Sequence, residues 1–249
     1  MKTMHLLLSI LTALILSGCS AMVKLAANLE TITPSGVIVS EERLVSGFTA
    51  IDMRTFGKVT LRQGEAESLT VSGSDNLVEL VKTSVRNGVL VIETRQGVTI
   101  NNPQEDLLTF EVVVKDLNEL TLSGLGTVQM DALRAENFKA VVSGAGELQI
   151  QDLQANRVEV TVSGLGGVSI AGKAAEQQVE IPGAGSVHNG DLECAVASVR
   201  VSGMGSAKLW VTETLTGEIS GSGSVTYYGD PQTTLSTPGL GSFKALGSK

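Results

Sequence analysis

Histidines and paired carboxyl groups are the side chains best suited to catalyse hydrolysis, and this sequence offers few of either. His5 lies within the expected signal segment 1–18, which leaves His188 as the single histidine of the remaining chain. A catalytic triad needs a nucleophile and an orienting acid beside its histidine. His188 instead shares a repeat position with Gln, Ser, Lys and Thr, so we expect it to be an exposed strand residue.

Glycoside cleavage needs two carboxyl groups on either side of the scissile bond. The glutamates that could supply them are scattered without an evident pairing: Glu111, Glu119, Glu136, Glu147 and Glu159. We therefore expect no enzyme, and a carbohydrate-active enzyme is the least favoured alternative.

Ligand sets for metal ions and phosphates are equally incomplete. Asp131, Asp152 and Asp191 each lie seven or eight residues after a motif glycine, but the nine-residue repeat of calcium ladders is missing, and we interpret these aspartates as turn residues. The segment from Gly167 to Lys173 matches part of the P-loop pattern, yet it is followed by alanine where a magnesium-binding Ser or Thr belongs. We expect neither a metal site nor a cofactor.

Trp210 and Tyr228 are the side chains best suited to binding a ligand. Each lies seven residues after a motif glycine, Gly203 or Gly221, so the two rings should occupy neighbouring turns of one repeat. Exposed aromatic faces can stack on sugar rings, while packing at the C-terminal end of the fold is the alternative explanation. We treat Trp210 and Tyr228 as a candidate pair for a glycan or a surface-protein ligand.

The N-terminus carries a pattern typical of export. Lys2 precedes an apolar stretch over residues 6–16, which is about half as long as a bilayer span requires. The stretch ends in Leu16-Ser17-Gly18-Cys19, an order that resembles the lipobox of bacterial lipoproteins. That resemblance implies removal of residues 1–18, acylation of Cys19 and attachment to a membrane through the lipid.

Ser20 follows the lipobox cysteine, and the same resemblance then implies the outer membrane, with the membrane face left open. Cys194 would be the single cysteine of the mature chain, without a partner for an intramolecular disulfide. We expect it to behave as a small buried side chain rather than as a reactive thiol.

The charge of the chain excludes another class of partner. The net charge is −8, and it becomes −9 once residues 1–18 and their one charged residue, Lys2, are removed. No basic cluster is present, which argues against binding of nucleic acid or anionic head groups.

A glycine motif with a period of about 20 residues must position these side chains. The first glycine of each Gly-x-Gly lies 20, 20, 19, 20, 18 and 18 residues after the previous one, which is typical of a solenoid. The seven motifs are Ser123-Gly124-Leu125-Gly126, Ser143-Gly144-Ala145-Gly146, Ser163-Gly164-Leu165-Gly166, Pro182-Gly183-Ala184-Gly185, Ser202-Gly203-Met204-Gly205, Ser220-Gly221-Ser222-Gly223 and Pro238-Gly239-Leu240-Gly241.

Alignment of the repeats on that glycine gives uniform columns. Position +4 is always apolar and position +5 always polar, which is the alternation of a half-buried strand. Uniform columns predict an all-β fold, a parallel β-helix in which Val128, Leu148 and Val168 stack on one another. An antiparallel meander or sandwich, with each Gly-x-Gly as a hairpin loop, is the alternative.

The preceding part of the chain lacks the short repeat. Alternating strands and an Asn87-Gly88 turn signal predict β-structure over residues 44–117, as irregular coils or as a cap on the stack. We expect one β-solenoid domain over 44–249, with regular coils over 118–246 and a lipidated tether over 19–43.

Several further features are present over about residues 44–246: Ser46-Gly47-Phe48 leading into Ile51, Gly57 to Leu61, Asn87-Gly88 with Val89 to Ile92, and the Ser-Gly-x-Gly ladder. In these features the chain resembles the "putative auto-transporter adhesin, head GIN domain" family of exported bacterial proteins. The resemblance implies a β-helical fold and an envelope location, and it supplies no catalytic residues.

We therefore predict a non-enzymatic, lipid-anchored envelope protein whose solenoid is an adhesin-like binding module. A structural envelope protein, acting as a spacer or by self-assembly, is the alternative function.

Overall fold

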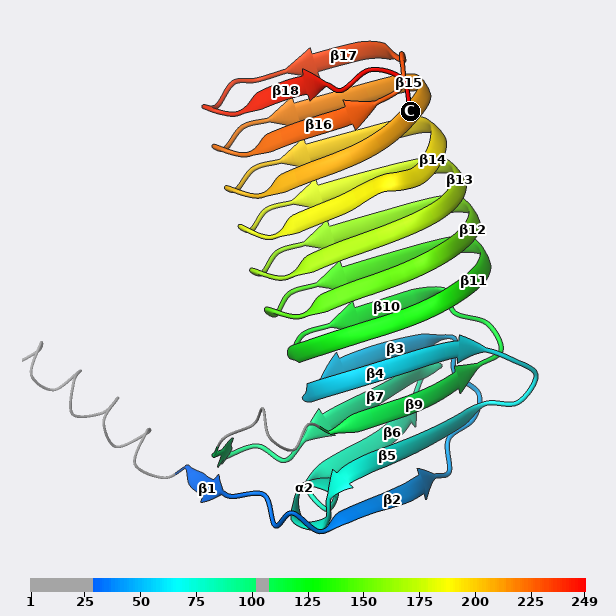
Figure 1. Cartoon of the computed structure of the whole chain (residues 1–249), viewed down its shortest axis with the longest axis vertical. Helices are drawn as coiled ribbons and strands as arrows, with labels where there is room; N and C mark the ends of the chain where they lie inside the picture. The colour runs from blue at the N-terminus through cyan, green and yellow to red at the C-terminus, as the bar shows by residue number, and fades with distance from the viewer. Residues whose placement is uncertain (1–28, 102–107) are drawn as a thin grey trace, which may run out of the picture.

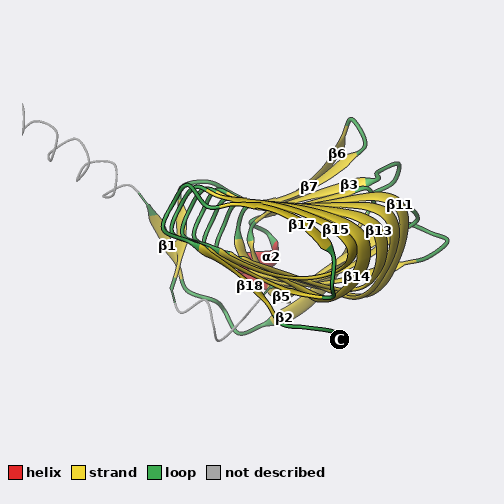
Figure 2. Ribbon diagram, turned by 90° about the horizontal axis from the view of Figure 1, so that it is seen from above, coloured by secondary structure: helices red, strands yellow, loops and turns green. Residues whose placement is uncertain are grey.

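The computed structural model describes residues 29–101 and 108–249. They form a parallel β-solenoid of about 6 turns, with its coils stacked along one axis (Figure 1) and flattened in cross-section (Figure 2). The predicted signal segment 1–18 and Cys19 lie outside the described residues. Within them, no helix is long and apolar enough to cross a membrane.

The regular stack consists of five long strands that each follow most of one coil, with shorter strands before and after them. Each pairs in parallel with the next coil, so that equivalent residues of successive repeats are hydrogen-bonded neighbours. The strands are β10 (Glu119–Leu122), β11 (Leu125–Val142), β12 (Glu147–Val162), β13 (Gly167–Ile181), β14 (Ser186–Val201), β15 (Ser206–Ile219), β16 (Ser224–Tyr228), β17 (Gln232–Ser236) and β18 (Ser242–Ala245).

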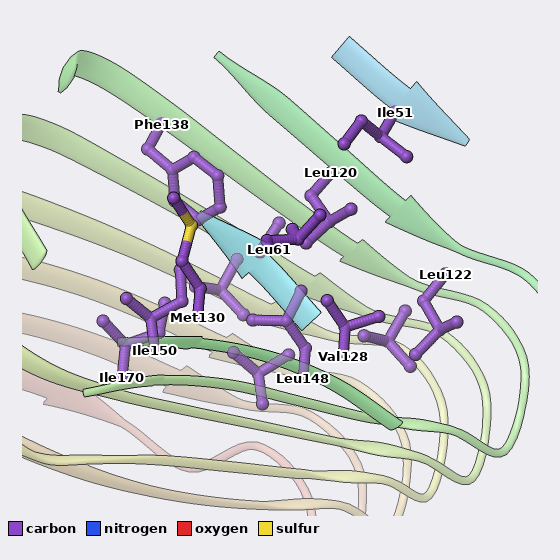
Figure 3. Close-up of a cluster of buried hydrophobic side chains, with 14 of the residues drawn as sticks. Ile51, Leu61, Leu120, Leu122, Val128, Met130, Phe138, Leu148, Ile150 and Ile170 are labelled. Atoms are coloured by element: carbon purple, nitrogen blue, oxygen red, sulfur yellow. The ribbon is translucent and has the colours of Figure 1, made fainter. Parts of the chain in front are cut away.

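The predicted aliphatic columns are confirmed. Val128 pairs with Leu148, and Leu148 pairs with Val168. All three side chains are at most 1% exposed, and Figure 3 shows Val128 and Leu148 within the packed interior. Because each coil buries its aliphatic side chains against the coils above and below, stability comes from the stack rather than from any one coil.

The Gly-x-Gly corners stack directly on one another along one narrow edge of the solenoid (Figure 2). At Gly164, a methyl group would overlap the backbone carbonyl oxygen of Gly144 in the coil below. The corner glycines do not have positive φ angles, so glycine is required here by the close approach of two backbones.

The bend opposite the corners is wider and absorbs the differences in repeat length. Register shifts interrupt the ladders between Ile150 and Leu153, between Ser169 and Ala171, and between Asn189 and Glu193. These irregularities keep the aliphatic columns in phase although the repeats differ by up to two residues.

The first coils of the solenoid do not follow chain order. The coil made by β3 and β4 lies between the later strands: β10 and β7 both pair with β3, and β11 and β9 both pair with β4. The strands are β3 (Ala50–Arg54), β4 (Phe56–Gln63), β7 (Val89–Thr94) and β9 (Thr109–Val114).

Antiparallel strands close this end of the stack, which resolves the choice between irregular coils and a cap: both are present. β5 (Ser68–Ser74) is antiparallel to β9 and to β2 (Ile38–Arg43), and β6 (Val81–Arg86) forms a hairpin with β7. A short helix, α2 (Asp75–Val78), follows β5. The hairpin turns at Asn87 and Gly88, both with positive φ, as the Asn-Gly signal predicts.

The prediction of a tether over residues 19–43 was wrong for its last part. β1 (Glu30–Ile32) pairs with β8 (Val98–Ile100), and β2 is an edge strand of the main sheet. β2 has mostly exposed residues on both faces, and a strand without a buried face has no apolar alternation to reveal it.

Candidate functional site

The predicted aromatic pair is brought together. Trp210 in β15 and Tyr228 in β16 are register partners on neighbouring coils, and both side chains are partly exposed. The Nζ atom of Lys249 lies 4.8 Å from the centroid of the Trp210 ring and 5.5 Å from that of Tyr228. We call Trp210, Tyr228, Lys249 and the adjacent Asp191 the aromatic cluster.

Surface contacts hold the lysine in place. Its Nζ donates to the backbone carbonyl oxygen of Gly190 at 2.5 Å and to the carboxylate of Asp191, whose side chain is exposed. A cation on an exposed ring face and an exposed ion pair each contribute on the order of 1 kcal/mol or less. A ligand can therefore displace this ammonium group from the rings, or bind beside it.

The coil below the aromatic cluster departs from the predicted column. Gly190 is expected beside Trp210 from equal repeat offsets, but Glu193 occupies that place because β14 bulges between Asn189 and Glu193. The bulge brings Gly190 and Asp191 out to where the Lys249 ammonium group binds them.

A buried polar chain lies directly beneath the cluster, and the sequence analysis missed it. The Ile170 N–H donates to Oδ1 of Asn189 at 3.2 Å, and Nδ2 of Asn189 donates to Oε1 of Gln177 at 3.2 Å. Nε2 of Gln177 donates to Sγ of Cys194 at 3.0 Å, and that thiol donates to the Trp210 carbonyl oxygen at 3.2 Å. One signal was available: Asn189 interrupts a column of Met130, Ile150, Ile170 and Leu209.

Cys194 is only 1% exposed, which agrees with the expected small buried side chain. Burial raises the pKa of its thiol to about 11, opposed by the hydrogen bond from Gln177. A thiol in this state is protonated at neutral pH, so it is a poor nucleophile.

The glutamates considered for glycoside cleavage do not form a pair. In the ladder that contains Glu119 and Glu159, Lys139 stands between them in register, and its Nζ lies 3.4 Å from Oε1 of Glu119. Glu111 faces Arg62 at 3.9 Å. His188 is exposed on its strand, as predicted.

The remaining side chains considered for metal or phosphate binding are also dispersed. Asp131, Asp152 and Asp191 are exposed, and Asp152 lies opposite Ala132 rather than Asp131. In residues 29–101 and 108–249, no group of three or more His, Cys, Asp or Glu side chains is placed to hold a metal ion. Gly167 to Lys173 lies within β13, without the strand-to-helix turn of a P-loop.

The β6–β7 hairpin projects from the solenoid (Figure 2), and a hollow lies beside it. Its lining includes Asp52, Arg54, Arg86, Glu93 and Glu119. Arg54 binds the Asp52 carboxylate through Nε at 2.7 Å, so part of this charge is already neutralised within the hollow. Its mixed charges give it no preference for one sign of ligand.

Comparison with known proteins places the fold in a family. A family model described as "Putative auto-transporter adhesin, head GIN domain" matches residues 47–231. Among curated proteins, no match to this sequence is found.

Several solved structures have the same fold. A "putative adhesin" from Bacteroides fragilis is 26% identical with a TM-score of 0.83, and the match covers 86% of this chain and all of that one. Two proteins from Parabacteroides distasonis, a "putative lipid binding protein" and a "putative adhesin", are each 19% identical, with TM-scores of 0.73 and 0.69. Each match covers 87% of this chain and 100% of the other. Because the family model matches most of the sequence and the predicted solenoid is present, the chain belongs to the auto-transporter adhesin head GIN domain family.

Proposed function

We propose that this protein is a non-enzymatic, adhesin-like binding module of the bacterial cell envelope, held at the outer membrane by acyl chains on Cys19. Family membership supports an adhesin-like surface or envelope protein. The lipobox Leu16-Ser17-Gly18-Cys19 supports the anchor, since two or more acyl chains bind a membrane firmly.

The observation that carries a binding role is the aromatic cluster. Trp210 and Tyr228 present two ring faces in register on adjacent coils, about 4.8 Å apart along the stack. The apolar CH face of a saccharide can cover such rings, while its hydroxyl groups can bond to Lys249 and Asp191. The proposed ligand is therefore a glycan of a neighbouring cell or of the envelope.

Trp210 is the only tryptophan of the chain, so its fluorescence reports directly on this site. The experiment adds glycans selected from an array to the full-length protein and follows Trp210 emission, together with binding to whole cells. Tyr228→Ala, followed by Trp210 emission, should weaken binding by about tenfold, the stacking contribution of one ring. Trp210→Ala lacks the fluorophore, so its equal loss is measured on the glycan array and on whole cells. Thr226→Ala on the same strand β16 is the matched control and should bind as the parent does.

Unchanged glycan and cell binding in both aromatic variants would remove the aromatic cluster as a binding site. Protease shaving of intact cells tests the location separately: digestion places the module outside the cell, and protection places it on the periplasmic side.

A structural envelope role is the second candidate, and the C-terminal end of the stack supports it. Among the strands of residues 29–101 and 108–249, β17 pairs only with β15 and β18 only with β16, so each keeps one edge available for another chain. A sedimentation coefficient that rises with protein concentration would favour assembly, and a constant value would favour the binding module. The carbohydrate-active enzyme has no comparable support, because its five candidate glutamates are dispersed.

A further inference from the structure

The x residues of the Gly-x-Gly motifs form a row of exposed side chains along the corner edge. We call this row the corner ridge: Leu125, Ala145, Leu165, Ala184, Met204, Ser222 and Leu240. Its four large members are strongly exposed, with Leu125 at 65%, Leu165 at 75%, Met204 at 74% and Leu240 at 90%. They make up nearly half of the exposed large hydrophobic residues in the described part of the chain.

Backbone contacts give the ridge its regularity. The N–H of Leu165 donates to the Gly144 carbonyl oxygen at 3.1 Å, and the N–H of Met204 donates to the Gly183 carbonyl oxygen at 3.1 Å. Each x residue therefore points outward from a fixed corner. Large side chains occupy every second coil, roughly 10 Å apart, with Ala or Ser between them.

The edge that carries the ridge is almost free of charge. Across the seven corners, from the residue before the first glycine to the residue after the second, Glu147 is the single charged residue. Elsewhere charged residues are common, since they are 18% of the whole chain. The residues flanking the ridge are mainly serines, whose hydroxyl groups can bond with water or lipid head groups.

The chain enters the solenoid at this same edge. β1 lies beside the stacked corners (Figure 2). Its partner β8 shares a hollow of about 560 Å³ with the first corner, and the lining includes the apolar Val98, Ile100 and Leu125 as well as Arg54 and Arg95. Nine residues separate Cys19 from Leu29, and they span at most about 35 Å when extended. An acylated Cys19 would therefore hold the corner edge close to the membrane.

We infer that the corner ridge rests on the lipid bilayer, with Leu125, Leu165, Met204 and Leu240 inserted at the level of the head groups. The solenoid then lies along the membrane, and its flat faces stand away from it. A second protein copy fits the ridge less well. Stable interfaces use roughly 20–30 residues on each side, whereas the ridge is one row of seven residues along a narrow edge. Lipid conforms to such an edge, and apolar burial requires no basic residues.

This inference rests on the lipid anchor of the proposed function, and the experiment separates the two. Single cysteines are introduced at the ridge as Leu165→Cys or Met204→Cys, and on a flat face as His188→Cys, in the full-length protein expressed in bacteria. Each is labelled with an environment-sensitive fluorophore, with the parent chain as the background control for buried Cys194. The labelled proteins are reconstituted into vesicles of phosphatidylethanolamine and phosphatidylcholine that contain spin-labelled lipid.

The ridge labels should be quenched about twofold or more beyond the His188→Cys label, with emission shifted to the blue. Adding Leu125→Ser and Leu240→Ser should lower the quenching at position 165 toward the value at position 188. Mass spectrometry of the N-terminal peptide shows whether the chain is acylated. If it is acylated and the labels at positions 165, 204 and 188 are quenched equally, the ridge contact is overturned and the anchor is left intact. Energy transfer between ridge labels on different molecules, without quenching by lipid, overturns the ridge contact in favour of a second protein copy. An unacylated N-terminal peptide overturns both the anchor and the orientation at the membrane.

Discussion

The regular stack (residues 118–246) and the N-terminal section (residues 29–117) share one column of aliphatic side chains but obtain their neighbours differently. In the stack, Leu148 pairs with Val128 and Val168, each 20 residues away in the chain. In the N-terminal section, Ala50 pairs with Val89 and with Glu119, 39 and 69 residues away. The stack repeats one local step, whereas the section before it must bring distant segments together.

The two regions also end differently. β2 closes the N-terminal end as an edge strand that carries Glu41, Glu42 and Arg43, and charged edge strands resist pairing with other chains. The C-terminal coil has no antiparallel cover among the described residues, and its Phe243 remains partly exposed. Closing one end of a solenoid therefore required a separate, non-repeating section.

The largest predicted effect is inside the N-terminal section. Phe110 is fully buried between register partners Val59 in β4 and Val71 in β5. Phe110→Ala should lower the free energy of unfolding by about 3–5 kcal/mol, as measured by urea denaturation. Phe243→Ala, at the partly exposed C-terminal end, should cause less than half of that loss. Equal losses would show that the two ends are equally closed.

The next effect concerns the corners of the stack. Gly164→Ala should destabilise the protein by about 3 kcal/mol, because its methyl group would overlap the Gly144 carbonyl oxygen and the coils would have to separate. Leu165→Ala at the same corner is the control, since that side chain is exposed, and it should change stability by no more than about 0.5 kcal/mol. A tolerated Gly164→Ala would contradict close backbone approach as the reason for the glycine.

A smaller effect is expected from the polar chain inside the stack. Asn189→Leu should cost about 2 kcal/mol, because the Ile170 N–H and Oε1 of Gln177 lose their partner inside the core. The double variant Asn189→Leu/Gln177→Leu should recover part of this loss, giving a favourable coupling energy in a double-mutant cycle of unfolding free energies. Strictly additive losses would show that the two amides act independently.

The smallest effect is a pH dependence of stability from Cys194. Its folded pKa, raised by burial to about 11, lies above the ordinary value of 9.0 for a free thiol. The unfolded thiol therefore ionises first, so its contribution to stability is complete below pH 9 and is lost as the pH rises toward about 11. Unfolding free energies from pH 8 to 11 should fall more steeply for the parent than for Cys194→Ala. Parallel curves would mean that the thiol is hydrated in the folded state.

The regular coils could be predicted because their specification is local. A glycine corner at a nearly constant period sets which residues share a column, and the column through Val128, Leu148 and Val168 follows directly. The turn at Asn87-Gly88 is likewise a two-residue signal with one favoured geometry.

The order of the first coils and the details of the candidate site depend on contacts that no local sequence pattern encodes. β10 could have stacked on β9, its predecessor in the chain, but it stacks on β3, a choice made by long-range packing. The bulge in β14 replaced Gly190 with Glu193 beside Trp210, because unequal repeats shift residues at the wide bend. The aromatic pair itself was predictable from its spacing, whereas the Lys249 ammonium group above it comes from a segment outside the repeat.

The stacking of like coils also bears on how such a protein can change length during evolution. A duplicated segment of about 20 residues between two corners of the stack would add one more coil, lengthening the rod by about 4.8 Å while every neighbouring column continues unbroken. The same duplication between β3 and β9 would disturb more contacts. The coil of β3 and β4 already lies between strands from distant parts of the chain, so a new coil there would separate existing partners. Variation in rod length among relatives should therefore concentrate toward the C-terminal end.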